Sequence, residues 1–228
     1  MRYNGGMQKV LITGSGGVVG KSLVNGLAYD ISEYDLPQYD VADYDQLLAS
    51  AEGHSAIVHL AWNKKRDDWL AEDFDPRNIE MTRTALEAAA HASVKRVIIA
   101  SSVHADKFFN RAIHGLLKPY ALPVPDSPYG ASKCMIEALG RYYADAKGLE
   151  VICIRFGGVN PTDEPPEQPV SERQVWLSHR DAVDLVSKCI AAKEVPGNYA
   201  IINAVSNNKD LLHDISNPFG WTPQDGAA

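Results

Sequence analysis

Hydrophobic residues along this chain form two alternating patterns. Short runs rich in valine, isoleucine and leucine have the length and composition of buried β-strands, whereas the segments between them carry apolar residues at helical spacing. The predicted strands cover residues 9–13, 31–35, 56–61, 96–101, 151–156 and 199–203. The predicted helices cover residues 17–27, 43–52, 76–93, 129–147 and a segment that begins after Ser178. This alternation predicts an α/β fold, in which helices cover both faces of a doubly wound parallel sheet.

Two segments interrupt the alternation. Residues 106–128 contain Pro119, Pro123 and Pro125 and show no periodicity, and residues 160–169 contain four further prolines. Long irregular segments in a compact domain commonly border a functional site. We therefore expect the first of these loops to lie at the mouth of a site.

Composition and charge are those of one ordinary globular unit. The chain has 228 residues, 45% of them hydrophobic and 22% charged, and its formal net charge is -7. An acidic protein has no general electrostatic attraction for nucleic acids or anionic membranes, and no apolar run is long enough for a transmembrane helix. Cys134, Cys153 and Cys189 are far apart, and no histidines have metal-ligand spacing. We expect reduced thiols, no metal site and a cytoplasmic location.

A glycine-rich motif joins the first predicted strand to the first predicted helix, and it reads Thr13-Gly14-Ser15-Gly16-Gly17-Val18-Val19-Gly20. In this context Gly14 suits a tight turn, Gly17 a close approach of the backbone to a pyrophosphate, and Gly20 close packing of helix on strand. The helix N-terminus would offer free N–H groups to the phosphates. The predicted dinucleotide-binding residues of this turn are Gly14, Gly16, Gly17, Val18 and Gly20.

The segment Gly20-Lys21-Ser22 also resembles the end of a phosphate-binding P-loop. The first glycine of that motif would fall on Ser15, so the spacing fails by one residue. No apolar run ends in the acidic residue that such proteins use to hold a metal ion. A nucleoside triphosphatase is therefore disfavoured.

An acidic residue follows the second predicted strand at the spacing that suits an adenosine ribose. Asp35 lies about 20 residues beyond the glycines, where a carboxylate can accept hydrogen bonds from the ribose hydroxyls. The same carboxylate would repel a 2′-phosphate, and no arginine or lysine lies at positions 15–19 to offset it. We therefore expect NAD to be preferred over NADP. Asp40 is a second candidate, for contact with the adenine.

A tyrosine and a lysine four residues apart supply candidate chemistry. Tyr129 and Lys133 would face the same side of the helix predicted over 129–147. A free tyrosine has a pKa of about 10, and a neighbouring cation lowers it, so the phenolate becomes available as a general base. The pair follows Ser101-Ser102 at the end of a predicted strand. The order of glycine turn, serine, tyrosine and lysine predicts an oxidoreductase, in which the phenolate takes a hydroxyl proton as hydride leaves the same carbon.

With these motifs the sequence resembles the short-chain dehydrogenase/reductase superfamily, in the extended branch that contains sugar-nucleotide epimerases, dehydratases and sugar dehydrogenases. The matching elements are residues 13–20, His59-Leu60-Ala61, Ser101-Ser102, Tyr129 to Lys133, and Arg155-Phe156-Gly157. The resemblance implies a Rossmann-type sheet that binds NAD, with residues 1–160 as the NAD-binding core and 161–228 as a small substrate-side region packed on it in one structural unit. It also implies a homodimer and a small-molecule sugar substrate.

The resemblance assigns roles to individual residues. It implies a catalytic triad of Ser102, Tyr129 and Lys133, in which the lysine also binds the nicotinamide ribose and the serine orients the substrate oxygen. It places Leu60, Ala61 and Ser101 along the cofactor and Phe156 near the nicotinamide. Trp62, just after this strand, is interpreted either as a roof over the nicotinamide or as a packing residue.

Within the branch, the chain is most similar to uronate dehydrogenases. The similarity rests on Ser101-Ser102-Val103-His104, residues 129–134, residues 176–181 and residues 219–223. It implies that Arg173 pairs with a substrate carboxylate, since a guanidinium suits that planar group, and that Ser102 and His104 hold substrate oxygens. The predicted reaction is oxidation at C1 of a hexuronic acid to the lactone.

Two departures leave other substrates open. Val103 replaces an asparagine and Gly158 a serine of those enzymes, and each change removes a hydrogen-bonding group. The alternatives are dehydrogenases of another aldose or a sugar phosphate, an epimerase, and a non-catalytic NAD-sensing protein. About 70 residues follow Phe156, which leaves little room for a nucleotide sugar and disfavours the epimerase. The intact triad disfavours the sensor.

Overall fold

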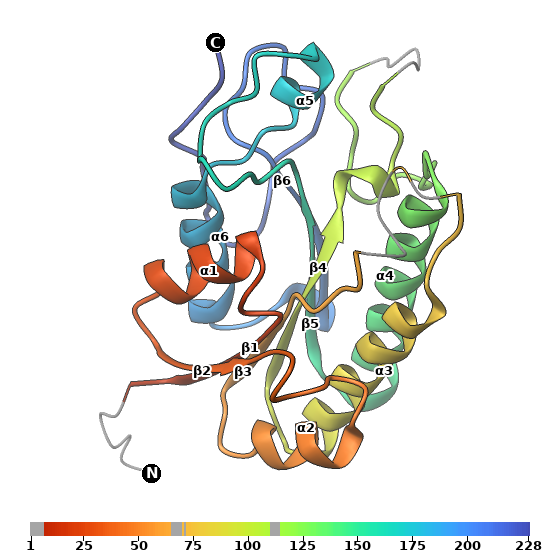
Figure 1. Cartoon of the computed structure of the whole chain (residues 1–228), viewed down its shortest axis with the longest axis vertical. Helices are drawn as coiled ribbons and strands as arrows, with labels where there is room; N and C mark the ends of the chain where they lie inside the picture. Colours follow the sequence, from red (N-terminus) through yellow and green to blue (C-terminus); the bar gives the residue numbers. More distant parts are fainter. Residues whose placement is uncertain (1–6, 65–69, 71, 110–114) are drawn as a thin grey trace.

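A six-stranded parallel sheet separates two layers of helices in the computed structural model (Figure 1), which describes residues 7–64, 70, 72–109 and 115–228. The strands are β1 (Lys9–Thr13), β2 (Asp30–Tyr34), β3 (Ala56–His59), β4 (Arg96–Ser102), β5 (Glu150–Phe156) and β6 (Tyr199–Ala204). Their order across the sheet is β2-β1-β3-β4-β5-β6, and all neighbouring pairs are parallel. The predicted α/β fold with a parallel sheet is therefore confirmed.

The helices also lie where the sequence predicts them, with some short additions. The predicted ones are α1 (Val18–Gly26), α2 (Tyr44–Ala51), α3 (Pro76–His91), α4 (Pro128–Lys147) and α6 (His179–Ala191). The sequence does not predict α5 (Val170–Gln174), nor the 3-10 turns η1 (Val103–Ala105) and η2 (Pro196–Asn198), because elements of three to five residues are too short to show a helical period.

Helix boundaries follow from side-chain caps. Asp43, Asp75, Ser127 and Ser178 each accept a hydrogen bond from a backbone N–H in the first turn of α2, α3, α4 and α6, respectively. By contrast, α1 begins after Gly17 without any side-chain cap. The first N–H groups of α1 are therefore not satisfied by a capping side chain.

Two hydrophobic layers bury the sheet from both sides. Helices α2, α3 and α4 pack on one face, and α1 and α6 pack on the other, as Figure 1 shows. This double covering explains why the central strands are nearly continuous apolar runs rather than alternating ones. The segment 161–228 supplies α6 and the edge strand β6, so it completes the sheet and one helical layer.

Strand order reverses between β1 and β3, which places a crevice at the carboxyl ends of these strands. The glycine-rich turn follows β1, and the segments that carry Leu60 and Ser102 follow β3 and end β4. These segments lie at one edge of the sheet because all the strands run in the same direction. Among the described residues, no helix has the length and apolar composition needed to cross a bilayer.

Candidate active site

A cavity of about 400 Å³ lies at this edge of the sheet. Its glycine-turn side is formed by segments that follow β1 and β3, namely Gly14, Gly17, Val18, Val19, Gly20, Leu60, Trp62 and Lys64. Its α5 side is formed by segments that follow β4, β5 and α5, namely Val103, His104, Gly157, Gly158, Val159, Glu172 and Val175. Ala100, Ser101, Ser102, Tyr129, Lys133 and Phe156 complete the lining. One cavity thus contains the predicted triad and most of the predicted cofactor residues.

The glycine turn leaves no space for side chains. Gly14 has φ +72°, and a Cβ there would lie 2.7 Å from the backbone nitrogen of Ala61. A Cβ at Gly20 would lie 2.4 Å from the carbonyl oxygen of Gly14. Ala61 therefore supports the turn through its backbone, and it is absent from the described lining of the cavity.

The same turn fits the phosphates of a dinucleotide. Gly17 ends the turn as the N-cap of α1, and no side chain occupies the capping position. The exposed N–H groups and the positive end of the helix dipole favour an anion there. The backbone of this turn therefore suits the pyrophosphate of the dinucleotide that the sequence predicts.

Asp35 lies immediately after β2, where it contacts the turn. Its Oδ2 accepts a hydrogen bond of 2.7 Å from the backbone N–H of Gly16, and its Oδ1 accepts one of 2.8 Å from that of Leu36. Asp35 therefore holds the glycine turn against the end of β2. Asp40 is instead engaged by Arg77, whose guanidinium donates to Asp40 Oδ2 at 2.5 Å.

Lys133 extends from α4 into the cavity and is held by two contacts. Its Nζ donates a hydrogen bond of 2.9 Å to the carbonyl oxygen of Ala100, and it lies 3.2 Å from the centre of the Trp62 ring. A cation over the face of an indole is stabilised by the ring quadrupole. The Tyr129 ring lies 5.4 Å from the same Nζ and packs edge-on against Trp62. Lys133 Nζ is thus held close to the phenol ring.

A buried histidine next to this pair contributes no charge. His59 has its Nδ1 2.8 Å from Thr13 Oγ1 and its Nε2 3.2 Å from Thr82 Oγ1. Burial, reinforced by the positive charge of Lys133, lowers the pKa of His59 to about 3. The imidazole is therefore neutral at physiological pH.

Ser102 and His104 lie at the end of β4. Ser102 Oγ accepts a hydrogen bond of 3.3 Å from the backbone N–H of His104. The His104 ring packs against Tyr129 with a centroid distance of 5.8 Å, and its Nδ1 lies 2.7 Å from Asp126 Oδ2. Asp126 therefore fixes the orientation of this ring beside Tyr129. No sequence pattern singles out Asp126, which lies in the predicted loop.

A buried ion pair joins α4 to β5. Arg155 Nε donates to Glu137 Oε1 at 2.8 Å, and the Ser101 hydroxyl donates to the same oxygen at 2.5 Å. Ser101 lines the cavity, as predicted for a cofactor contact, but its hydroxyl is used in this network. The network joins β4, β5 and α4, which carry Ser102, Phe156 and Lys133.

Close backbone packing fixes the position of the catalytic helix. A Cβ at Gly130 would lie 2.1 Å from the carbonyl oxygen of His104, so α4 touches η1 at this point. Only a glycine after Tyr129 permits this contact. The sequence shows Gly130 within the motif but does not reveal what it touches.

Arg173, the predicted partner of a substrate carboxylate, and Glu172, the residue before it, differ in whether they line the cavity. Arg173 is half-buried in α5 and is not among the described residues that line the cavity. Glu172, one residue earlier, does line it, and its Oε2 lies 3.8 Å from where a Cβ of Gly158 would be. Sequence reasoning did not single out Glu172, because one acidic residue in a polar segment carries no distinctive pattern.

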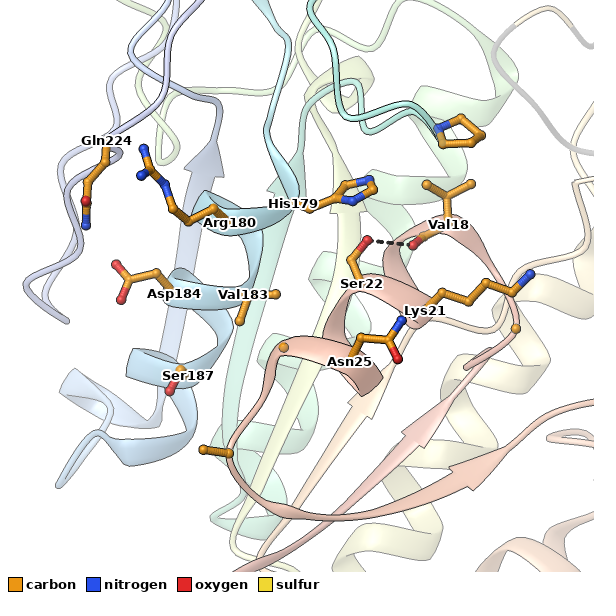
Figure 2. A pocket seen from close by; sticks show the side chains of 14 residues that line it. Val18, Lys21, Ser22, Asn25, His179, Arg180, Val183, Asp184, Ser187 and Gln224 are labelled. Carbon is orange, nitrogen blue, oxygen red and sulfur yellow. Dashed lines mark hydrogen bonds between the residues drawn. The ribbon is translucent and has the colours of Figure 1, made fainter.

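A second cavity of about 830 Å³ lies between α1 and α6 (Figure 2). Its charged side chains are largely engaged with other residues: Arg180 with Asp225, and Asp184 with Lys188 at 3.3 Å. It borders the glycine turn at Gly16 and Val18 but contains no residue of the triad. The cavity that contains Tyr129 is therefore the candidate active site.

Comparison with known proteins agrees with the geometry. Residues 10–160 match the model of the NAD dependent epimerase/dehydratase family, which is more than half of the chain. The chain belongs to this family. This confirms the resemblance to extended short-chain dehydrogenases/reductases, and it confirms that the protein is an NAD-binding enzyme of that type.

Individual relatives of the family cover nearly the whole chain. An L-arabinose 1-dehydrogenase (NAD(P)(+)) from Haloferax volcanii is 32% identical over 97% of this chain and 98% of its own length. An NAD-dependent glucose-6-phosphate dehydrogenase from the same organism is 29% identical over 97% of this chain and 95% of its own length. The crystal structure of uronate dehydrogenase from Agrobacterium tumefaciens superimposes with a TM-score of 0.79 at 26% identity, covering 97% of this chain and 86% of that one.

Proposed function

We propose that this protein is an NAD-dependent sugar dehydrogenase that oxidises the C1 hydroxyl of a sugar ring to the lactone. The observation that carries the proposal is that the glycine turn and the triad of Ser102, Tyr129 and Lys133 line one cavity. The relatives named for oxidation of arabinose, glucose 6-phosphate and uronate support the substrate class.

In the proposed mechanism, Tyr129 is the general base. Its phenolate removes the proton of the C1 hydroxyl as the carbon–oxygen double bond forms. When bound at the glycine turn, NAD would supply the acceptor for the hydride of C1. Lys133, held against Trp62 and the Ala100 carbonyl, stabilises the phenolate electrostatically, and Ser102 and His104 hold the reacting oxygen in place.

The cofactor residues follow from the same geometry. Gly14, Gly17 and the N-terminus of α1 would hold the pyrophosphate, with Leu60 and Phe156 lining the path to the nicotinamide. Asp35 would bind the adenosine ribose and favour NAD over NADP, because its carboxylate would repel a 2′-phosphate.

Two substrate classes have specific support. The sequence favours a hexuronic acid with Arg173 as the partner of its carboxylate, and that proposal requires Arg173 to enter the cavity. A neutral aldose is the second candidate, because Glu172 lines the cavity whereas Arg173 is not among the described residues that do.

Reduction of NAD and of NADP, followed by absorbance of the reduced nicotinamide, tests the proposal. The substrates are D-galacturonate, D-glucuronate, D-galactose, D-glucose, L-arabinose and glucose 6-phosphate. We expect reduction of NAD by at least one of them with a lactone as product. Failure of every sugar to reduce either cofactor would contradict the proposed dehydrogenase.

A further inference from the structure

The α5 side of the active-site cavity presents a carboxylate. Glu172 lines this wall from α5, a five-residue helix with no buried residue. The nearest atom to a Cβ built on Gly158 is Glu172 Oε2, at 3.8 Å. The side chain of Glu172 therefore reaches over the space that the glycine at position 158 leaves open.

Backbone hydrogen bonds join Gly158 to the segment that follows α5. Gly158 N–H donates to the Val175 carbonyl at 2.9 Å, and Leu177 N–H donates to the Gly158 carbonyl at 3.0 Å. A Cβ at Gly157 would lie 2.0 Å from that same Val175 carbonyl, so the two segments are in direct contact. The position of Glu172 against the cavity is thus fixed by its surroundings and not by its own side chain.

Within the part of the chain that the structure describes, Glu172 forms neither an ion pair nor a side-chain hydrogen bond. The two lysines of the lining, Lys64 and Lys133, follow β3 and project from α4, and Lys133 is held at Trp62. The lining of the α5 side also contains His104, whose Nδ1 lies 2.7 Å from Asp126 Oδ2.

We propose that Glu172 is a specificity-determining residue that selects neutral aldoses and rejects sugars carrying a carboxylate or a phosphate. The inference rests on the proposed dehydrogenase function and identifies the substrate class of that site. A carboxylate is an acceptor only, so it binds the hydroxyl groups that a neutral sugar presents. Against a second anion it offers only repulsion in a partly enclosed site, which is how unpaired charges reject the wrong ligand.

Two matched pairs of sugars isolate the effect of a negative charge on the substrate. D-galactose and D-galacturonate differ only at C6, as do D-glucose and D-glucuronate, and glucose 6-phosphate adds a phosphate at that carbon. For each sugar we would measure kcat/KM with NAD and, separately, the binding constant for the NADH-saturated protein by calorimetry. The calorimetric measurement requires no turnover.

The native protein is compared with Glu172→Gln, which keeps the shape and an acceptor oxygen but removes the charge. We expect the native protein to favour each neutral sugar over its uronate at least tenfold. We expect this ratio to fall about tenfold in Glu172→Gln, which corresponds to about 1.4 kcal/mol. The control is Glu167→Gln, an exposed glutamate outside the described cavity lining, which changes the net charge equally and is expected to leave the ratio unchanged.

The two readouts distinguish this inference from the function on which it rests. Uronates preferred or equal in the native protein, or a ratio unaltered by Glu172→Gln, would overturn the role of Glu172 while NADH formation still supports the dehydrogenase. Selective binding of neutral sugars without any NADH formation would support Glu172 and contradict the dehydrogenase. Absence of binding by all five sugars would overturn the role of Glu172, and if L-arabinose also failed to reduce either cofactor, the dehydrogenase would be overturned as well.

Discussion

The two sides of the active-site cavity are built by different means. On the glycine-turn side, Gly14 and Gly20 pack backbone against backbone, and a single added carbon would overlap a carbonyl or an amide. On the α5 side, Gly158 has 3.8 Å of clearance, and the wall is made of side chains such as Glu172 and Val175. One side is thus specified by the path of the main chain, and the other by which side chains project from it.

The supporting cores differ in the same way. The glycine turn rests on the sheet, between the two large hydrophobic layers. The α5 side rests on a small separate cluster that includes Val103, Phe108, Leu117, Val175 and Val205. We infer that changes on the first side affect folding and cofactor binding together, whereas changes on the second affect mainly the choice of substrate.

The largest effect is expected where the two sides meet. Tyr129→Phe removes the proposed general base without changing the packing against Trp62, so turnover should fall roughly 10²–10⁴-fold. NAD affinity, measured by calorimetry, should change little because the ring remains. Turnover within tenfold of the native rate would show that another group takes the proton.

The same substitution on both sides tests the comparison directly. Gly20→Ala places a Cβ 2.4 Å from a carbonyl oxygen, so we expect a loss of about 3 kcal/mol in the free energy of unfolding and weak NAD binding. Gly158→Ala is the matched control, since its Cβ would meet nothing closer than 3.8 Å. Thermal unfolding with and without NAD measures both effects. Equal losses in the two variants would remove the distinction between the sides.

A buried histidine beside the small cluster on the α5 side predicts that the protein becomes less stable in acid. His213 packs near Phe108, and neither ring nitrogen has a hydrogen-bond partner among the described residues. Burial, with the charges of Arg155 and His104, lowers the pKa of His213 to about 4. The folded state therefore favours the neutral ring. The contribution of this ring to the free energy of unfolding is fully present above about pH 6.5 and is lost as the pH falls toward 4.

Substitution of this histidine separates its contribution from that of other groups. His213→Leu should reduce the acid loss of unfolding free energy by up to about 3 kcal/mol between pH 6.5 and 4. Denaturant unfolding at a series of pH values provides the measurement. His91→Leu, at an exposed position of α3, should leave the pH dependence as it is. If His213→Leu lost as much unfolding free energy in acid as the native protein does, the result would contradict a buried neutral imidazole.

The smallest effect concerns the choice between cofactors. Asp35→Ala removes the carboxylate beside the predicted ribose, and we expect kcat/KM for NADP relative to NAD to rise about tenfold, or about 1.4 kcal/mol. Asp45→Ala, an exposed acid on α2, serves as the control of equal charge. A ratio that stays constant in Asp35→Ala would mean that another group reads the ribose.

The contrast between the two sides also explains what the sequence could predict. The strands, the long helices and the glycine turn follow from local periodicity and from backbone requirements that only glycine meets, so they are visible without a structure. The contact between Asp126 and His104, and that between Glu172 and Gly158, join segments that lie far apart or belong to loops and short helices. Their pairing depends on tertiary packing, which leaves no periodic signal.

Helix α5 has a consequence for how such an enzyme can change over time. Because none of its five residues is buried, substitutions there cost the fold little. A descendant of this protein can therefore exchange Glu172 for a neutral or basic residue and acquire a different sugar without first gaining stability elsewhere. The cofactor site would be inherited unchanged. Natural selection could then change which sugar the enzyme uses through one short helix that has no buried residue.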